Sequence, residues 1–227
     1  MKKRFNIFCQ VHKALKAMLY DTALSLQLAD FSTPEETTSA LDKLQITLAL
    51  LENHAMQEEK FILSYVHRFD AKLVDAYRME HRKEAAMSEK LKALVTVYRN
   101  AVSNTEKQEA GEILLGLYNE FVCFHLVHMS CEESALNQLL WSEMSDHQIL
   151  QLTRLILNNI PSDIRMIQDH WMFKSISNSE IVEWMSKVKD YATDEIFFSL
   201  LQIAERILPQ HRWIKVKEAL SEGVMVI

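Results

Sequence analysis

Two stretches of the chain place a histidine and a glutamate where one face of a helix would carry both. His54 is followed by Glu58 four residues later, and His128 by Glu132 at the same spacing. In a helix that spacing puts the two side chains on one face, one turn apart. A second glutamate follows each pair, so HAMQEE and HMSCEE form an internal repeat. Because imidazoles and carboxylates together suit iron, manganese or zinc, and two carboxylates suit the bridging of two ions, the repeat predicts a metal site.

The composition predicts that helices position these side chains. The 227 residues include only 3 Gly and 3 Pro, whereas average usage would give about 27 of the two together. Sheet proteins need both residue types at hairpins, bulges and tight turns. We therefore expect an all-α chain, and most sandwiches, barrels and Rossmann-type folds are excluded. The hydrophobic fraction of 48% excludes disorder and allows a sizeable core.

Residues 1–141 are expected to form an up-down-up-down four-helix bundle. Apolar residues recur at helical spacing, and start signals mark the second, third and fourth helices: Thr33-Pro34 with Glu36, Asp70, and Ser103 with Glu106. The linkers have only a few residues, which favours antiparallel neighbours. The four expected helices span about residues 5–29, 34–67, 70–101 and 103–141.

Residues 142–227 are expected to form a smaller, all-helical C-terminal extension. Pro161 and Pro209 mark breaks, and Ser177 with Glu180 forms a capping box. No set of residues in this region has the spacing of a site. The expected helices lie near residues 146–159, 162–174, 178–190, 194–207 and 210–221.

The turns of the expected bundle bring histidines from four helices to one level. With turns near residues 32, 68 and 103, residues equally far from a turn lie at the same height. His12 and His54 are each about 20 residues from the first turn, and His54 and His81 about 14 from the second. His81 and His125 are each about 22 residues from the third turn, with His128 one helical turn further.

A single histidine in a helix is more often solvated or hydrogen-bonded within the protein than bound to a metal. Several imidazoles and two carboxylates in one core would, however, be costly to bury without a common partner. A bound metal removes that cost. The candidate metal ligands are His12, His54, Glu58, His81, His125, His128 and Glu132.

This pattern resembles the hemerythrin-like (HHE cation-binding) family over residues 5–141. The resemblance consists of a histidine on the first helix, HxxxE on the second, a histidine on the third, and a histidine with a carboxylate on the fourth. VHKALKAML is similar to the start of bacterial members, and HMSCEE to their HMxxEE motif. The resemblance implies a non-haem di-iron centre, with His12 and His54 on one iron, His81 and His128 on the other, and Glu58 and Glu132 bridging.

Two departures from the oxygen-carrying hemerythrins change the expected function. Those proteins have two histidines four residues apart on the third helix, whereas Tyr77 and Ala85 flank His81 here. His125 either supplies the missing imidazole or supports a ligand from outside the coordination sphere. The carboxylate of the fourth helix also follows its histidine by four residues rather than five, which favours Glu132 over Glu133. The pattern is closer to members that respond to iron, oxygen or oxidants than to stable dioxygen carriers.

Three function classes stay open from the sequence. The first is a di-iron protein that binds or senses dioxygen, nitric oxide, peroxide or iron, with a protein partner at its C-terminal helices. The second is an enzyme that turns over such a small molecule, and the third is a metal-free helical interaction module. A ferritin-like site would need Glu-x-x-His pairs, which the second and fourth helices lack. His67 is expected outside the site, at the end of its helix.

Charge and cysteine content predict the partners and compartment. A net charge of −6 argues against nucleic acid, and no apolar run approaches the roughly 18 residues of a membrane span. Cys9, Cys123 and Cys131 lack zinc or CxxC spacing, so we expect reduced thiols of a cytoplasmic protein, buried as small apolar side chains.

Overall fold

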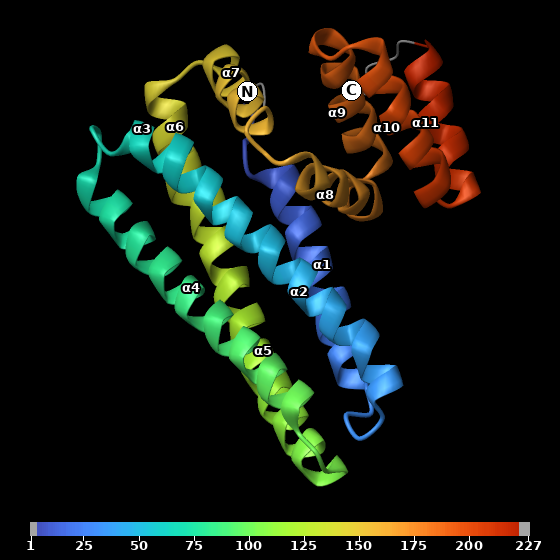
Figure 1. Ribbon diagram of the computed structural model, residues 1–227. Helices are drawn as coiled ribbons and strands as arrows, with labels where there is room; N and C mark the ends of the chain where they lie inside the picture. The colour runs from blue at the N-terminus through green and yellow to red at the C-terminus, as the bar shows by residue number, and fades with distance from the viewer. Residues whose placement is uncertain (1–3, 223–227) are drawn as a thin grey trace. The chain divides into compact units, whose positions relative to one another are not determined.

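The described part of the chain is all-helical, as the composition predicts. The computed structural model describes residues 4–222, and no strand occurs among them. The elements up to Glu143 are α1 (Cys9–Leu28), α2 (Pro34–Gln57), η1 (Glu58–Leu63), α3 (Ser64–Val66), α4 (Ala71–Asn100), α5 (Asn104–Cys131), η2 (Glu132–Leu136) and α6 (Asn137–Glu143). The elements that follow are α7 (Asp146–Leu157), α8 (Ser162–Ser175), α9 (Asn178–Tyr191), α10 (Asp194–Ile207) and α11 (Gln210–Glu222) (Figure 1).

Most of the expected helix starts are confirmed. Asp70 accepts a hydrogen bond from the backbone N–H of Leu73, and capping boxes form at Ser103 and Ser177. The capping box expected at Thr33 is wrong, since its side chain makes no cap bond. The Thr33 hydroxyl instead donates to the Asp30 carboxylate at 3.4 Å, which holds the preceding loop.

Contacts divide the chain into two compact units. The first comprises Met1–Phe8 and Met18–Pro161, and the second comprises Cys9–Ala17 and Ser162–Ile227. Residues 142–161 thus cluster with the long helices, and the first part of α1 clusters with the C-terminal helices. Residues 1–3 and 223–227, which belong to the two expected domains, lie outside the described part.

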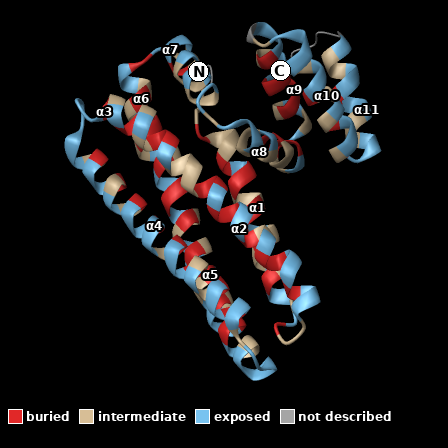
Figure 2. Ribbon diagram, in the orientation of Figure 1, coloured by how far each residue is buried: buried red, intermediate tan, exposed pale blue. Residues whose placement is uncertain are grey.

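Hydrogen bonds join the long helices of the first unit to one another. The hydroxyls of Thr22 and Thr47 link α1 to α2 at 2.7 Å, and Tyr118 of α5 donates to the backbone carbonyl of Leu19 at 3.2 Å. Ser88 of α4 donates to Glu52 of α2 at 2.5 Å. α4 and α5 run side by side over most of their length (Figure 1). Buried residues line α2, α4 and α5 along one side of each helix (Figure 2), and the up-down-up-down bundle stays a prediction.

The second unit has an apolar core of its own. Phe173 of α8 packs against Trp184 of α9 with ring centroids 4.9 Å apart, and Leu200 and Val216 add buried side chains from α10 and α11. Lys13 forms an ion pair with Glu180 at the start of α9.

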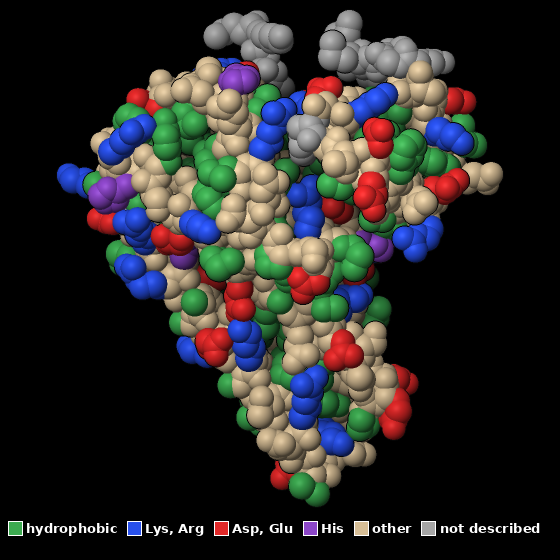
Figure 3. Space-filling model, turned by 45° about the horizontal axis from the view of Figure 1, so that its top comes forward, with side chains coloured by type: hydrophobic (Ala, Val, Ile, Leu, Met, Phe, Trp, Pro, Cys, Tyr) green, Lys and Arg blue, Asp and Glu red, His purple; other side chains and the backbone are tan. Residues whose placement is uncertain are grey.

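The exposed charges are of mixed sign on the face that Figure 3 shows, where acidic and basic side chains are interspersed.

One helical stretch, Asn104–Glu143, is long and apolar enough to cross a membrane by length and composition. Core helices of soluble proteins pass the same test. This stretch also carries buried ionisable residues, among them His125, His128 and Glu132. The expectation of a protein without a membrane partner therefore stays a prediction.

Two glycines of α5 test the packing of the first unit as a matched pair. A Cβ at Gly111 would lie 2.0 Å from Cγ of the buried Phe31 ring, whereas a Cβ at Gly116 would meet nothing within 4 Å. We expect Gly111→Ala to lower the free energy of unfolding by about 1–3 kcal/mol through overpacking. Gly116→Ala should raise it by about 0.5–1 kcal/mol, because alanine is the better helix former. Urea unfolding followed by circular dichroism measures both, and a Gly111→Ala protein as stable as wild type would contradict this packing.

Candidate metal centre

Both histidine–glutamate pairs form within their helices as the spacing predicts. His54 Nε2 lies 3.1 Å from Glu58 Oε1, and His128 Nε2 lies 3.2 Å from Glu132 Oε1. Both carboxylates are buried, with at most 2% of either residue exposed. The two pairs are therefore parts of the protein interior and not of a solvated helix face.

The second pair lies in a group of four buried side chains that could hold a metal ion. The potential ligand atoms of Glu58, His81, His128 and Glu132 all lie within 4.8 Å of one another. His81 Nε2 is 3.5 Å from Glu58 Oε2 and 3.8 Å from Glu132 Oε1. Ligand atoms bound to one ion at about 2.0–2.2 Å lie roughly 3–3.5 Å apart. The four side chains are thus close to the spacing that a shared ion needs.

The first pair belongs to a second group of potential ligands. The ligand atoms of His54, Glu58 and Glu132 lie within 4.8 Å of one another, and the sequence pattern adds His12 as a fourth candidate. His12 is completely buried, on the stretch of α1 that belongs to the second compact unit. Its role as a ligand stays a prediction.

The two carboxylate oxygens of Glu58 face two different histidines. Its Oε1 faces His54 and its Oε2 faces His81. Both Glu58 and Glu132 belong to both groups of potential ligands. A carboxylate with its two oxygens turned toward different imidazoles can bridge two metal ions.

Two further carboxylates orient the imidazoles of this centre. His81 Nδ1 lies 3.1 Å from Glu59 Oε1, and Glu59 is also 3.3 Å from Arg78. His128 Nδ1 lies 2.6 Å from Glu80 Oε2. An Nδ1–H that donates to a carboxylate leaves Nε2 with its lone pair toward the ligand group, which is the arrangement found around protein metal sites.

His125, predicted as a ligand or as a supporting residue, lies outside both groups of potential ligands that the described residues form. Its Nδ1–H donates to the backbone carbonyl of Phe121 at 2.9 Å, and its Nε2 faces Glu84 Oε1 at 3.1 Å. Both side chains are buried. The structure thus pairs His125 with Glu84, a carboxylate outside the set of predicted ligands.

The helix geometry changes at both carboxylates. η1 begins at Glu58 and η2 begins at Glu132, and both are π-helical segments inside otherwise α-helical stretches. The backbone N–H of Asn137 closes η2 by bonding to the carbonyl of Glu132, five residues earlier. π-Helical turns are rare and are found mostly at functional sites. Their coincidence with the repeated glutamates is a local feature that residue spacing alone did not reveal.

The carboxylates hold protons on the neighbouring imidazoles when no metal is bound. Burial opposes protonation of His81, but hydrogen bonds and charges from Glu132 and Glu58 outweigh it and raise its pKa to about 11. Burial likewise opposes protonation of His128, but Glu132 and Glu80 raise its pKa to about 9. Tyr77 packs edge-to-face on His128, and burial together with the charge of Glu132 raises its pKa. The metal-free centre therefore balances its carboxylates with protons.

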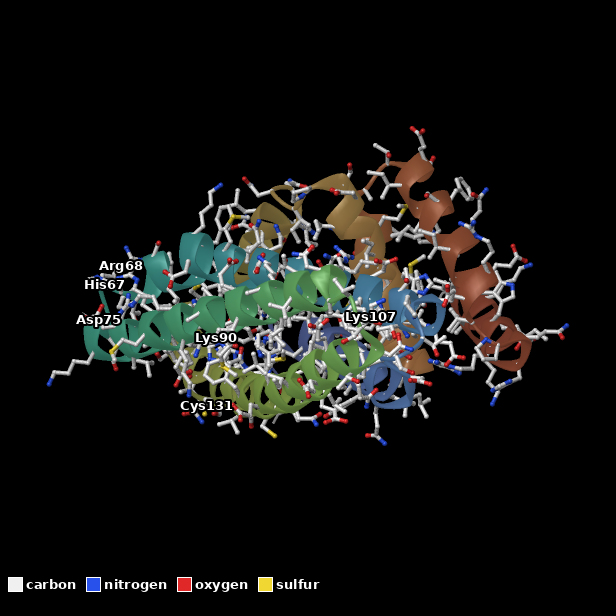
Figure 4. The ribbon with its side chains drawn as sticks, turned by 60° about the horizontal axis from the view of Figure 1, so that its bottom comes forward. His67, Arg68, Asp75, Lys90, Lys107 and Cys131 are labelled. Carbon is white, nitrogen blue, oxygen red and sulfur yellow. The ribbon has the colours of Figure 1, made fainter. Side chains whose placement is uncertain are left out.

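His67 and the cysteines, which the sequence also singled out, are not among the potential ligands of the centre. His67 is exposed at one end of the long helices, near Arg68, while Lys107 lies toward the other end (Figure 4). The cysteines are free, as expected, but none of the three is buried: Cys9 is partly exposed, and Cys123 and Cys131 are exposed. The physical reason is helix phase, since the adjacent Glu132 takes the buried side at that turn and leaves Cys131 on the outer side.

The raised histidine pKa values predict how the stability of metal-free protein depends on pH. His81 and His128 bind protons more tightly in the folded state than at their ordinary pKa of 6.5. Their contribution to stability is complete below pH 6.5 and is lost as the pH rises through about 9 for His128 and about 11 for His81.

We expect chelator-treated protein to lose stability from pH 6.5 toward pH 9, with urea unfolding as the measurement. A His128→Gln protein should show a shallower decline, and a His67→Ala protein should follow wild type. A wild-type profile that is flat or rises over this range would contradict the proton-holding centre.

Comparisons with known proteins add no family to these observations. The chain matches no protein-family model, no curated protein and no solved structure. The similarity to hemerythrin-like proteins therefore rests on the quoted motifs alone.

Proposed function

We propose that the protein binds two iron ions at this centre and uses them to bind or sense a small oxidant or iron itself. The observation that carries the proposal is the burial of Glu58 and Glu132 within 4.8 Å of imidazole nitrogens from His81 and His128. Ionised groups in a protein interior are costly unless they share a compensating charge. A metal ion provides that charge to all four side chains at once.

The residues present fit a pair of iron ions. Carboxylate and imidazole ligands suit iron, with manganese and zinc as the other candidates. Glu58 turns one oxygen toward His54 and the other toward His81, which is the orientation a bridging ligand needs. The proposed ligands are His12 and His54 on one ion, His81 and His128 on the other, and Glu58 and Glu132 on both.

Protonation of the histidines is the alternative explanation of how the buried carboxylates are compensated. With His81 and His128 protonated, two positive imidazoles face two negative carboxylates. Such a cluster could be a buried ion-pair network without a metal, as in the metal-free interaction module. Because metal ligands must be deprotonated, metal binding would release these protons, and the affinity should rise with pH. The two accounts thus differ in a measurable way.

The proposal includes the similarity to hemerythrin-like proteins and the four-helix bundle that the sequence predicts. When bound, an iron pair with an open coordination position would supply affinity for dioxygen, nitric oxide or peroxide. The protein would contribute orientation, through Glu59 on His81 and Glu80 on His128, and exclusion of water through burial. Tyr77, which packs on His128, is one of the two residues that flank His81 at four-residue spacing, where an oxygen carrier would have a second histidine.

A sensor is favoured over an enzyme because the sequence offers no second catalytic constellation beside the histidine–glutamate set. A sensor also needs a surface for its partner. On α10 of the second unit, Ile196 and Phe198 are 51% and 58% exposed, so apolar side chains are available for such a contact. Sustained consumption of peroxide by iron-loaded protein, lost in His54→Ala, would assign the enzyme instead.

Metal content tests the proposal. Protein from iron-supplemented cells should contain about two irons per chain and absorb visible light in air. Glu58→Ala should lose both ions, because this residue belongs to both groups of potential ligands. Glu58→Gln, which keeps the size of the side chain, should also bind less iron, since an amide is a poorer ligand than a carboxylate.

His67→Ala is the matched control, because it removes an exposed histidine at the end of the same stretch of helix. It should keep the iron content of wild type. Circular dichroism on each variant separates loss of metal from loss of fold. A folded wild-type protein that takes up no iron, or a folded Glu58→Ala protein that keeps both ions, would contradict the proposal.

A further inference from the structure

A surface hollow between α4 and α5 extends to one side of the candidate metal centre. It has a volume of about 580 Å³. Its lining comes from the two helices alone and includes Glu80, Lys83, Cys123, Phe124, Val127 and His128. Because only 4% of the His128 side chain is exposed, the hollow meets the centre at its inner wall and not through an open channel.

Phe124 covers His128 within this hollow. The two rings are stacked, with centroids 5.7 Å apart and planes 11° from parallel. The ammonium group of Lys83 lies 5.0 Å from the centroid of the Phe124 ring. Phe124 is half-buried and Val127 is 66% exposed, so the walls of the hollow become more covered toward His128.

The charge of the opening is set mainly by carboxylates. Glu80 is 43% exposed and holds His128 Nδ1 at 2.6 Å, and Glu120 adds a second carboxylate to the lining. Lys83 is the single lysine or arginine in the lining. Charges of one sign along an apolar-walled opening repel small ions of the same sign and do not affect neutral molecules.

We propose that this hollow is the entry for small neutral molecules, such as dioxygen, nitric oxide or hydrogen peroxide, with Phe124 as the gate and Glu80 as the filter against anions. The inference rests on the proposed function, since it concerns what reaches the metal centre. Glu80 therefore has two roles: it orients His128, and it contributes negative charge to the opening. Its amide analogue separates them, because a glutamine can still accept from Nδ1–H but carries no charge.

The gate can be tested without any bound metal. Dissolved dioxygen is paramagnetic and speeds the relaxation of nuclei that it reaches, so nuclear magnetic resonance of metal-free protein under dioxygen reports its path. Phe124→Ala should increase the relaxation effect on the His128 ring several-fold, and Phe124→Trp should decrease it. The effect on the exposed Val127 methyls should stay within error in both. Equal effects on His128 in wild type and both variants would overturn the gate.

The filter is tested on iron-loaded protein by stopped-flow mixing with azide, an anion, and with nitric oxide, a neutral molecule. Glu80→Gln should raise the azide association rate by roughly three- to tenfold at low ionic strength, with the gain falling as salt is added. The nitric oxide rate should be independent of ionic strength in both wild type and Glu80→Gln, because the molecule is neutral. Glu112→Gln, which removes an exposed charge of α5 outside the lining, should leave both rates as in wild type.

The outcomes separate this inference from the proposed function. A chain that binds no iron contradicts the proposed function, whereas the dioxygen measurement on metal-free protein still tests the gate. Iron-loaded protein whose azide and nitric oxide rates respond equally to Glu80→Gln would overturn the filter while leaving the metal centre intact.

Discussion

The structure depends on how two buried carboxylates are compensated. Glu58 and Glu132 lie on different helices, and each has a histidine one turn before it. Their charges must be balanced inside an apolar core, either by protons on His81 and His128 or by metal ions. Because compensation requires groups from α2, η1, α4, α5 and η2 to meet, the centre also holds these segments in register. Function and fold are thus linked through one electrostatic requirement.

The surrounding features all serve this cluster. The change to π-helical geometry begins at the two glutamates themselves. Glu59 and Glu80 fix the orientation of the imidazoles from outside. Glu80 extends this support to the surface, so the same side chain contributes to the orientation of His128 and to the charge of the hollow.

Much of this could be predicted from the sequence, because helical spacing is a local property. The scarcity of glycine and proline excluded sheets, and the four-residue spacing placed His54 with Glu58 on one helix face. Contacts between helices depend on rotation about each axis, which residue counts do not contain. The pairing of His125 with Glu84 and the support of His128 by Glu80 were missed for that reason. The π-helical turns were missed because no single residue type specifies them.

The central claim is that this cluster holds two metal ions. The most direct measurement is iron-edge X-ray absorption on protein purified from iron-supplemented cells, together with its iron content. The account predicts about two irons per chain, nitrogen and oxygen ligands, and a second iron about 3.5–4 Å from the first. A folded protein that contains no iron and takes up none when iron is added would contradict it, and would leave the buried carboxylates compensated by protons alone.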